Sequence, residues 1–263
     1  MPFTLAHPAA ILPLRGVRHL RTAPLVIGAL VPDVRYYVPW SLGRFVPETH
    51  SFAGSFTTDL VLGYAALAVV YLLRQPLTAL LSARARWLCL RALVPFSSRR
   101  GEWLWAGLAI LIGVWTHLLW DSFTHSDGWI VHRVAALSAP VTIGAYSGPL
   151  CHLLQYLSSV FGLAAMGVWY WRLPAPPRAP SAADTVRPAT GLVLVLVAAA
   201  GALIGSVQAT EYFLHAYNQH AYNFYHTLNI LLTRSLAWSA ALYLVAGTLA
   251  TLERAHERVS DSF

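Results

Sequence analysis

Five long apolar runs limit how this chain can fold, at roughly residues 56–73, 103–122, 150–171, 190–210 and 230–251. About 20 apolar residues in a helix cross the hydrocarbon core of a bilayer. Backbone groups in lipid must be hydrogen-bonded within the protein, which favours helices. Only 11% of the 263 residues are charged, against about 25% in soluble domains. The sequence therefore predicts an all-α, polytopic membrane helical bundle with five or six transmembrane helices.

The N-terminal region has shorter apolar segments, 8–14 and 24–32, which contain or end in prolines. They are too short to span. If His7 and Asp33 share a site, the chain between them must leave and return, which predicts a re-entrant N-terminal helix pair. A crossing by residues 22–41 instead would give six spans. The turn of the re-entrant pair would carry three arginines, Arg15, Arg18 and Arg21.

The arginines of the remaining chain are distributed asymmetrically. Six lie in 74–102, three in 172–189 and two in the C-terminal tail, against one in 123–149 and none in 211–229. Basic loops stay cytoplasmic. We therefore expect a multi-pass protein of the cell (inner or plasma) membrane, with its His-rich face outside the cytoplasm. The net charge of +7 is interpreted as membrane topology and contact with lipids, not as nucleic-acid binding.

The segments between the spans have distinct compositions. The composition of residues 74–102 predicts an amphipathic surface helix, and that of residues 173–188 predicts a Pro- and Ala-rich linker. Residues 124–149 and 211–229 are expected to form loops. The GALIG sequence at 201–205 matches a small-residue packing face. We divide the chain into an N-terminal membrane domain, 1–149, and a C-terminal helical bundle, 150–263, which we expect to form one integrated domain.

The strongest chemical signal is HLLWDSFTH, in which His117, Asp121 and His125 recur at intervals of four. Each step of four returns to nearly the same side of a helix, drifting by about 40°. Two imidazoles and a carboxylate on one face can bind a divalent cation, and they suit zinc, manganese or iron. The alternative is a helix end whose polar residues face water. A carboxylate in such an apolar run favours the metal site, since it costs about 2.5–3.5 kcal/mol at a bilayer centre.

More ionisable residues are expected on the same side of the membrane. Asp59, one turn into the first span, is either a partner of the site or an acid favoured by the helix N-terminus. Intramembrane and juxtamembrane ionisable groups are functional candidates by default. The others are His7, Asp33, His50, Asp127, His132, Glu211, His215, His220 and His226.

Four motifs carry a family resemblance: FTLAHPAAILPL at the start, GALVPD at 28–33, His50 followed by SFAG, and HLLWDSFTHSDGW at 117–129. They resemble an uncharacterised bacterial family of integral membrane proteins known only as a domain of unknown function. More distantly, residues 1–130 resemble the YdjM-like inner-membrane metal-dependent hydrolases.

The distant resemblance implies five metal ligands, His7, Asp33, His50, His117 and Asp121, with zinc as the expected divalent ion. Asp121 and His125 would be the catalytic residues. This sequence departs from the YdjM-like pattern in the residues after Asp33 and in having one histidine near His50, where that pattern has two. Both departures argue against a two-metal site, although His125 offers a further ligand.

The leading interpretation is a metal-dependent hydrolase at the membrane surface, acting on a lipid-linked phosphoester. A bound metal lowers the pKa of water towards about 7. Arg35 or Arg133 would hold a phosphate or serve as interfacial anchors. No Gly-x-Ser-x-Gly motif or Gly-rich phosphate loop is present. The alternative is a metal- or proton-coupled transporter or a structural partner, with Glu211 and Arg234 on a polar pathway. Ligands around one solvent-reachable cavity favour the hydrolase, and ligands along a transverse line favour the transporter.

The predicted orientation is testable by labelling single cysteines from outside intact cells, in a background lacking Cys89 and Cys151. Cysteines replacing Ser126 and Asn218 should react, because both lie in Arg-poor segments. One replacing Ser181, in the Arg-bearing linker, should not. Labelling at Ser181 alone would mean that the orientation is inverted.

Overall fold

The computed structural model describes residues 3–38, 45–93, 100–144, 146–176, 188–219 and 224–260. Within them, five helices are long and apolar enough to cross a membrane. These are Phe52–Leu72, Gly101–Thr124, Leu150–Arg172, Thr190–Asn218 and Thr227–Glu257. The predicted all-α polytopic bundle is confirmed, with five spans.

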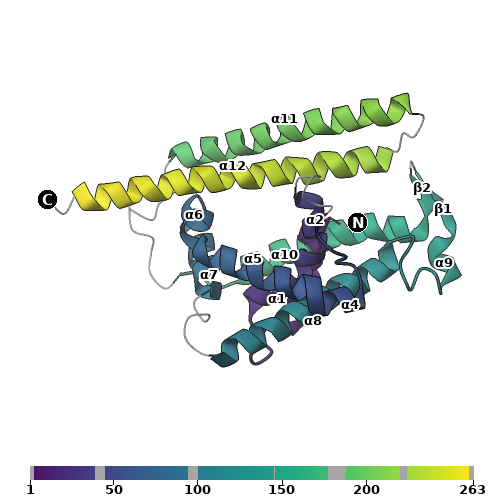
Figure 1. The fold of residues 1–263 in the computed structure, drawn as a ribbon, viewed down its shortest axis with the longest axis horizontal. Helices are drawn as coiled ribbons and strands as arrows, with labels where there is room; N and C mark the ends of the chain where they lie inside the picture. Colours follow the sequence, from purple (N-terminus) through teal and green to yellow (C-terminus); the bar gives the residue numbers. More distant parts are fainter. Residues whose placement is uncertain are drawn as a thin grey trace. The chain divides into compact units, whose positions relative to one another are not determined.

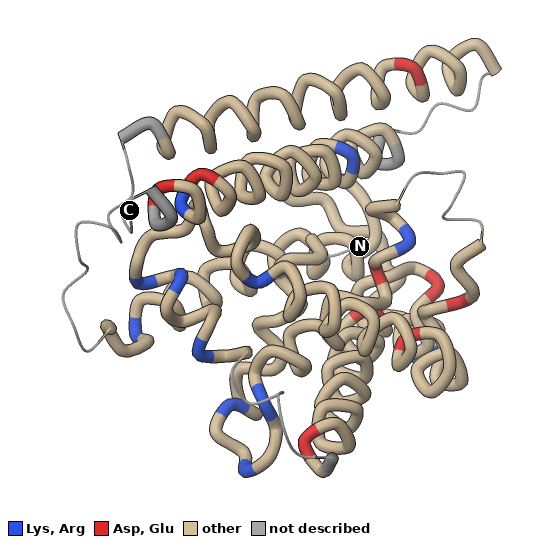
Figure 2. The backbone as a smooth tube through the Cα atoms, turned by 60° about the vertical axis from the view of Figure 1, so that its left-hand side comes forward, with Lys and Arg blue, Asp and Glu red and all other residues tan. Residues whose placement is uncertain are grey.

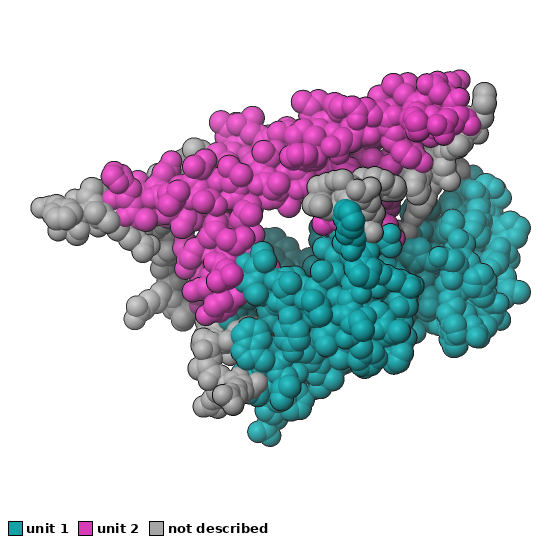
Figure 3. Space-filling view, in the orientation of Figure 1, with its two compact units in different colours: residues 1–35, 44–69, 92–174 teal, residues 36–43, 70–91, 175–263 magenta. Residues whose placement is uncertain are grey.

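The chain forms two compact units, shown in teal and magenta in Figure 3. The first unit contains residues 1–35, 44–69 and 92–174, and the second contains 36–43, 70–91 and 175–263. The division of the chain into domains at residue 149 stays a prediction, because compact units do not show which segments fold independently.

The N-terminal helix pair leaves and returns as predicted. It consists of the 3₁₀ helix η1, Thr4–Leu14, and the α-helix α1, Thr22–Leu30, and it continues into η2, Val31–Asp33, and α2, Val34–Tyr37. Gly16, at φ +84°, occupies the left-handed region at the turn, where glycine has no steric penalty. The return is closed by a hydrogen bond of 2.6 Å from Thr4 Oγ1 to Asp33 Oδ2.

Helix α8, Arg100–Thr124, carries the HLLWDSFTH sequence and packs closely against α1. A side chain at Gly28 would collide with the backbone of Ile110, and one at Gly113 with the carbonyl of Leu25. The absence of side chains lets the two backbones approach each other. This contact places the end of α1, and Asp33 just beyond it, beside the last turns of α8.

The first span begins at Phe52, four residues earlier than predicted. It starts with α4, Phe52–Gly54, continues as the π-helical segment η3, Ser55–Asp59, and ends as α5, Leu60–Leu72. The Ser51 hydroxyl caps the start by accepting a hydrogen bond of 2.9 Å from the Gly54 N–H, a preferred N-cap arrangement. Short π segments are rare and are often found at functional sites.

The prediction of a single amphipathic helix over residues 74–102 is wrong. The structure has two short helices, α6, Arg74–Ala79, and α7, Ala83–Leu93, while residues 94–99 lie outside the described residues. Ser82 accepts a hydrogen bond of 3.3 Å from the Ala85 N–H. This local cap starts a new helix and interrupts the pattern.

The loop expected over 124–149 contains regular structure, so that prediction is also wrong in part. A short helix, α9, Ala135–Ser138, precedes an antiparallel hairpin of β1, Pro140–Ile143, and β2, Tyr146–Pro149. Gly144 has a φ of +59°, which suits a tight turn between the strands. Helix α10, Leu150–Arg172, then follows, as the third span predicted.

Helices α11, Pro188–Asn218, and α12, Phe224–Ser260, run side by side in the second unit (Figure 1). Both carry long uncharged stretches (Figure 2). The prediction of a loop over residues 211–229 is wrong for 211–218 and 224–229, which are helical. These residues include no Gly or Pro, so each helix continues past its apolar run, where its backbone stays hydrogen-bonded.

The predicted small-residue packing face at 201–205 is confirmed. A side chain at Gly201 would collide with Ser239, and one at Gly205 with Ser235, both on α12. Because each glycine of α11 lies against one serine of α12, the two contacts fix the register of α11 against α12.

We predict that Gly205→Ala destabilises the protein by about 1–3 kcal/mol, because the added methyl group would overlap the Ser235 backbone. Gly191→Ala is the matched control on the same helix, since a side chain there meets no atom within 4 Å. Thermal unfolding in detergent measures both. Equal melting temperatures for the two variants would contradict the close packing.

Candidate metal centre

The structure brings together the five residues that the sequence predicted as metal ligands. His7 comes from η1, Asp33 from η2, His50 from the segment before α4, and His117 and Asp121 from α8. His117 Nε2 lies 3.2 Å from Asp121 Oδ2, and His50 Nε2 lies 3.4 Å from Asp33 Oδ1. His7 Nε2 lies 3.6 Å from Asp121 Oδ1. All five belong to the first unit.

These separations suit the ligands of one metal ion. Two donor atoms at about 2.0–2.1 Å from a tetrahedral zinc lie about 3.3 Å from each other. One group consists of His7, Asp33 and His117, and another of His50, His117 and Asp121. Within each group the ligand atoms lie within 4.8 Å of one another. Because His117 belongs to both groups, the five side chains surround one common position.

The two carboxylates of the cluster are buried. Asp33 is 0% exposed and Asp121 is 7% exposed. In the described part of the chain, Asp33 Oδ1 and both Asp121 oxygens have no hydrogen-bond partner, nor does His117 Nε2. Burying a carboxylate without compensation is strongly unfavourable. The atoms that face the centre therefore need a cation, either a proton or a metal ion.

Neighbouring groups orient two of the imidazoles. His117 Nδ1 lies 2.9 Å from the Ala29 carbonyl oxygen, which can only accept, so Nδ1 carries the hydrogen. Thr49 Oγ1 donates to the Pro32 carbonyl at 2.7 Å and lies 3.1 Å from His50 Nδ1. The single Thr49 proton is used, so Thr49 accepts from His50. In their neutral forms both histidines then direct an unprotonated Nε2 inward, as metal-binding histidines do.

His7 is stacked on His117, with ring centroids 3.8 Å apart and an angle of 16° between the planes. Burial lowers the pKa of His7 to about 3, and the adjacent His117 contributes to this lowering. Two stacked imidazolium ions would repel each other. His7 is thus kept neutral, which is the form that coordinates a metal.

His125 lies at the edge of this cluster. Its Nδ1 is 3.5 Å from Asp121 Oδ1, and its side chain is 23% exposed, close to the 28% of His50. Burial lowers the pKa of His125. These two histidines are the most exposed of the group, so the centre opens to its surroundings on their side.

Asp59 extends the cluster beyond the predicted ligands. It is 0% exposed, and neither carboxylate oxygen has a hydrogen-bond partner among the described residues. It interacts electrostatically with His50 and His117. This favours the interpretation as a partner of the site over a solvent-facing helix acid. The sequence signal was an acid inside an apolar span, whereas no signal marked Thr49.

Several predicted polar residues do not join the centre. Asp127 and His132 are exposed, as is His215, which belongs to the second unit. His220 lies outside the described residues, and so does the side chain of His226. The Arg133 guanidinium covers the Trp129 ring at 4.1 Å, as an interfacial anchor would, and Arg35 is exposed.

A family model described as "Domain of unknown function (DUF4184)" matches residues 1–250. No curated protein and no solved structure matches the chain. The comparisons thus support the resemblance to an uncharacterised family and give no support to the distant one to YdjM-like hydrolases. Because the match covers nearly the whole sequence, the chain belongs to the DUF4184 family of unknown function.

Proposed function

We propose that this membrane protein is a metal-dependent hydrolase whose centre binds one divalent ion, with zinc as the first choice. The supporting observation is the convergence of inward-facing atoms from separate chain segments, most of them without another hydrogen-bond partner among the described residues. The proposed ligands are His7, Asp33, His50, His117 and Asp121.

Charge balance supports a divalent ion over a proton. Asp33 and Asp121 together carry two negative charges, and neutral histidines add none. A single proton on His117 would neutralise one carboxylate only. A divalent ion compensates both, and nitrogen and oxygen donors in this ratio suit zinc, manganese or iron.

The exposed edge supports a catalytic function. A divalent ion lowers the pKa of a bound water towards about 7 and polarises a phosphoryl or acyl oxygen. Asp121 and His125 stand where water can enter, with His125 Nδ1 at 3.5 Å from Asp121 Oδ1. His125 is placed to accept a proton from the attacking water and to deliver it to the leaving group. Asp121 orients His125 and the water.

We infer a lipid-linked phosphoester as the substrate and membrane lipids as the surroundings of the site. The centre is formed near the end of the span Gly101–Thr124 and just before the span Phe52–Leu72, at the depth where a lipid-linked substrate would carry its phosphoester. The proposed location is the cell membrane, with the centre outside the cytoplasm, as the arginine distribution predicts. A transporter is less well supported, because the five ligands surround one position and do not form a line across the bundle.

We predict about one equivalent of transition metal in protein purified in detergent, lost on chelation. His117→Ala and Asp121→Ala should each reduce it below about one tenth, because each removes a ligand from the same helix face. Asp127→Asn is the control, an exposed carboxylate outside the centre, and it should keep its metal. Elemental analysis measures all four proteins. Full metal content in both ligand variants would exclude this site.

We predict that His125→Gln lowers kcat for phosphoester hydrolysis by about 10²–10⁴-fold, the usual contribution of a general base, while the metal content is unchanged. The assay uses p-nitrophenyl phosphate and a short-chain lipid phosphate with wild-type protein as the reference. A wild-type protein that holds one metal and hydrolyses neither of these substrates would refute the hydrolase proposal and favour the transporter.

A further inference from the structure

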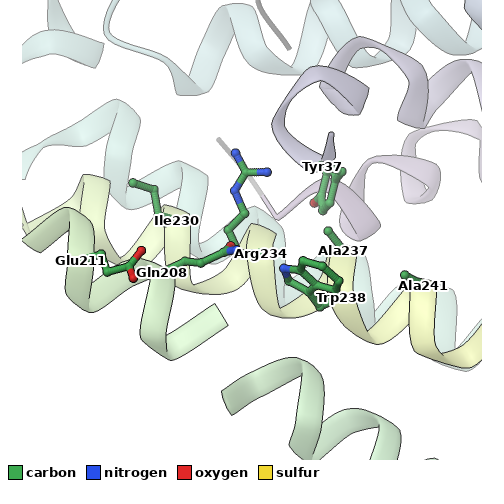
Figure 4. Close-up of a pocket in the computed structure, with 8 residues that line it drawn as sticks. All are labelled: Tyr37, Gln208, Glu211, Ile230, Arg234, Ala237, Trp238 and Ala241. Carbon is green, nitrogen blue, oxygen red and sulfur yellow. The ribbon is translucent and has the colours of Figure 1, made fainter. Parts of the chain in front are cut away.

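A cavity of about 460 Å³ lies in the second unit (Figure 4). Its lining combines two charged residues with aromatic and aliphatic ones from α2, α11 and α12. They are Tyr37, Gln208, Glu211, Ile230, Arg234, Ala237, Trp238 and Ala241.

The two charged residues of the cavity are not paired with each other. Arg234 Nη1 donates to the Val38 carbonyl at 2.6 Å, which leaves other guanidinium N–H groups available, since arginine has five. Glu211 has no ion pair or hydrogen bond within the described part of the chain. Figure 4 shows the two groups at separate positions along the cavity. Glu211 is exposed, and two opposite charges that share a cavity without pairing suit a ligand carrying both charges.

Both charged residues lie near the edge of the hydrocarbon layer. The spans Thr190–Asn218 and Thr227–Glu257 contain 29 and 31 residues, or about 45 Å of helix at 1.5 Å per residue. About 30 Å of this is needed to cross the hydrocarbon core. Glu211 and Arg234 are each seven residues from a span end, which is roughly 10 Å of helix. Both groups therefore lie close to the boundary between the hydrocarbon core and the headgroups.

The register of the two helices sets the order of the charges. Gly205 faces Ser235 and Gly201 faces Ser239, so Glu211 lies at the level of residue 229 on α12. Glu211 therefore lies closer than Arg234 to the end of α11 and the start of α12, by about five residues or roughly 7 Å along the helix axis. A ligand bound to both residues would place its cation outermost and its anion deeper.

An apolar strip continues inward from the charges. Ala237 and Ala241 follow Arg234 on the same face of α12, three and seven residues further inward, and Trp238 lies beside them. Ile230, one turn outward from Arg234, lies near the level of Glu211. Residues at these offsets share one face of a helix. The strip suits an acyl chain lying along α12.

We propose that this cavity binds a phospholipid with a primary-ammonium zwitterionic headgroup of the phosphatidylethanolamine type. Arg234 holds the phosphate, Glu211 accepts hydrogen bonds from the ammonium, and an acyl chain covers the strip from Ala237 to Ala241. Charge-assisted contacts of this kind are the strong ones. The order of the headgroup charges in a bilayer, with the ammonium outside the phosphate, is the order of the two residues.

The test adds phosphatidylethanolamine, phosphatidylglycerol or phosphatidylcholine to delipidated protein in detergent and measures binding by native mass spectrometry and thermal unfolding. Wild-type protein should bind phosphatidylethanolamine about tenfold more tightly than the other two. Phosphatidylcholine keeps both charges but has no ammonium N–H. Glycerophosphoethanolamine, which lacks acyl chains, should not stabilise the protein.

Two substitutions separate the headgroup contacts. Glu211→Gln should remove the preference for phosphatidylethanolamine over phosphatidylglycerol, and Arg234→Gln should weaken the binding of both. Arg234→Lys keeps the positive charge if Arg234→Gln fails to fold, and it should retain binding. Glu253→Gln, exposed on the same helix, is the control. An equal preference in wild type and Glu211→Gln, or tighter binding of phosphatidylglycerol by wild type, would overturn the proposal.

Discussion

The compensation of two buried carboxylates is the physical constraint on which the first unit depends. Asp33 and Asp121 are almost fully buried in a helical bundle where an isolated charge is costly. Protonating His117 would neutralise one of them, and a second proton on His7 or His50 would bring two positive rings together, with centroids 3.8 or 5.4 Å apart. A divalent ion satisfies both carboxylates without that repulsion. This comparison of the two cations, more than the ligand types, favours a metal.

The fold supports the centre through contacts outside it. Thr4 holds one oxygen of Asp33, and the Ala29 carbonyl fixes the ring of His117. Thr49 does the same for His50. The contact between Ala29 and His117 depends on the close packing of α1 against α8, without an intervening side chain at Gly28. A larger residue there would move Ala29 and Asp33 together, so the orientation of the ligands depends on helix packing several residues away.

The sequence was most informative where one local rule decides. The helical period places His117 and Asp121 on one face, and the apolar runs predicted all five spans. To bring Asp33 and His50 to that face, the chain needs a helix pair that leaves and returns. The short apolar segments indicated this pair only indirectly. The break at Ser82, the hairpin after Ser138 and the helical continuation at 211–218 were missed. The first depends on a single cap, the second on one glycine turn, and the third on the weak polarity of aromatic residues at a helix end. Composition does not predict such local features.

The same electrostatic constraint acts differently in the second unit. In the centre, acids and histidines converge until their ligand atoms lie 3.2–3.7 Å apart, so a small ion suffices. Glu211 and Arg234 do not converge in this way. The contacts of Gly205 with Ser235 and of Gly201 with Ser239 offset them by about five residues along the helix axis, and Arg234 donates to the Val38 carbonyl instead. A register shifted to bring them level would let them pair and would leave no charge for a ligand. The small-residue interface thus keeps both charges available, and a ligand that neutralises them must be long enough to reach from one to the other.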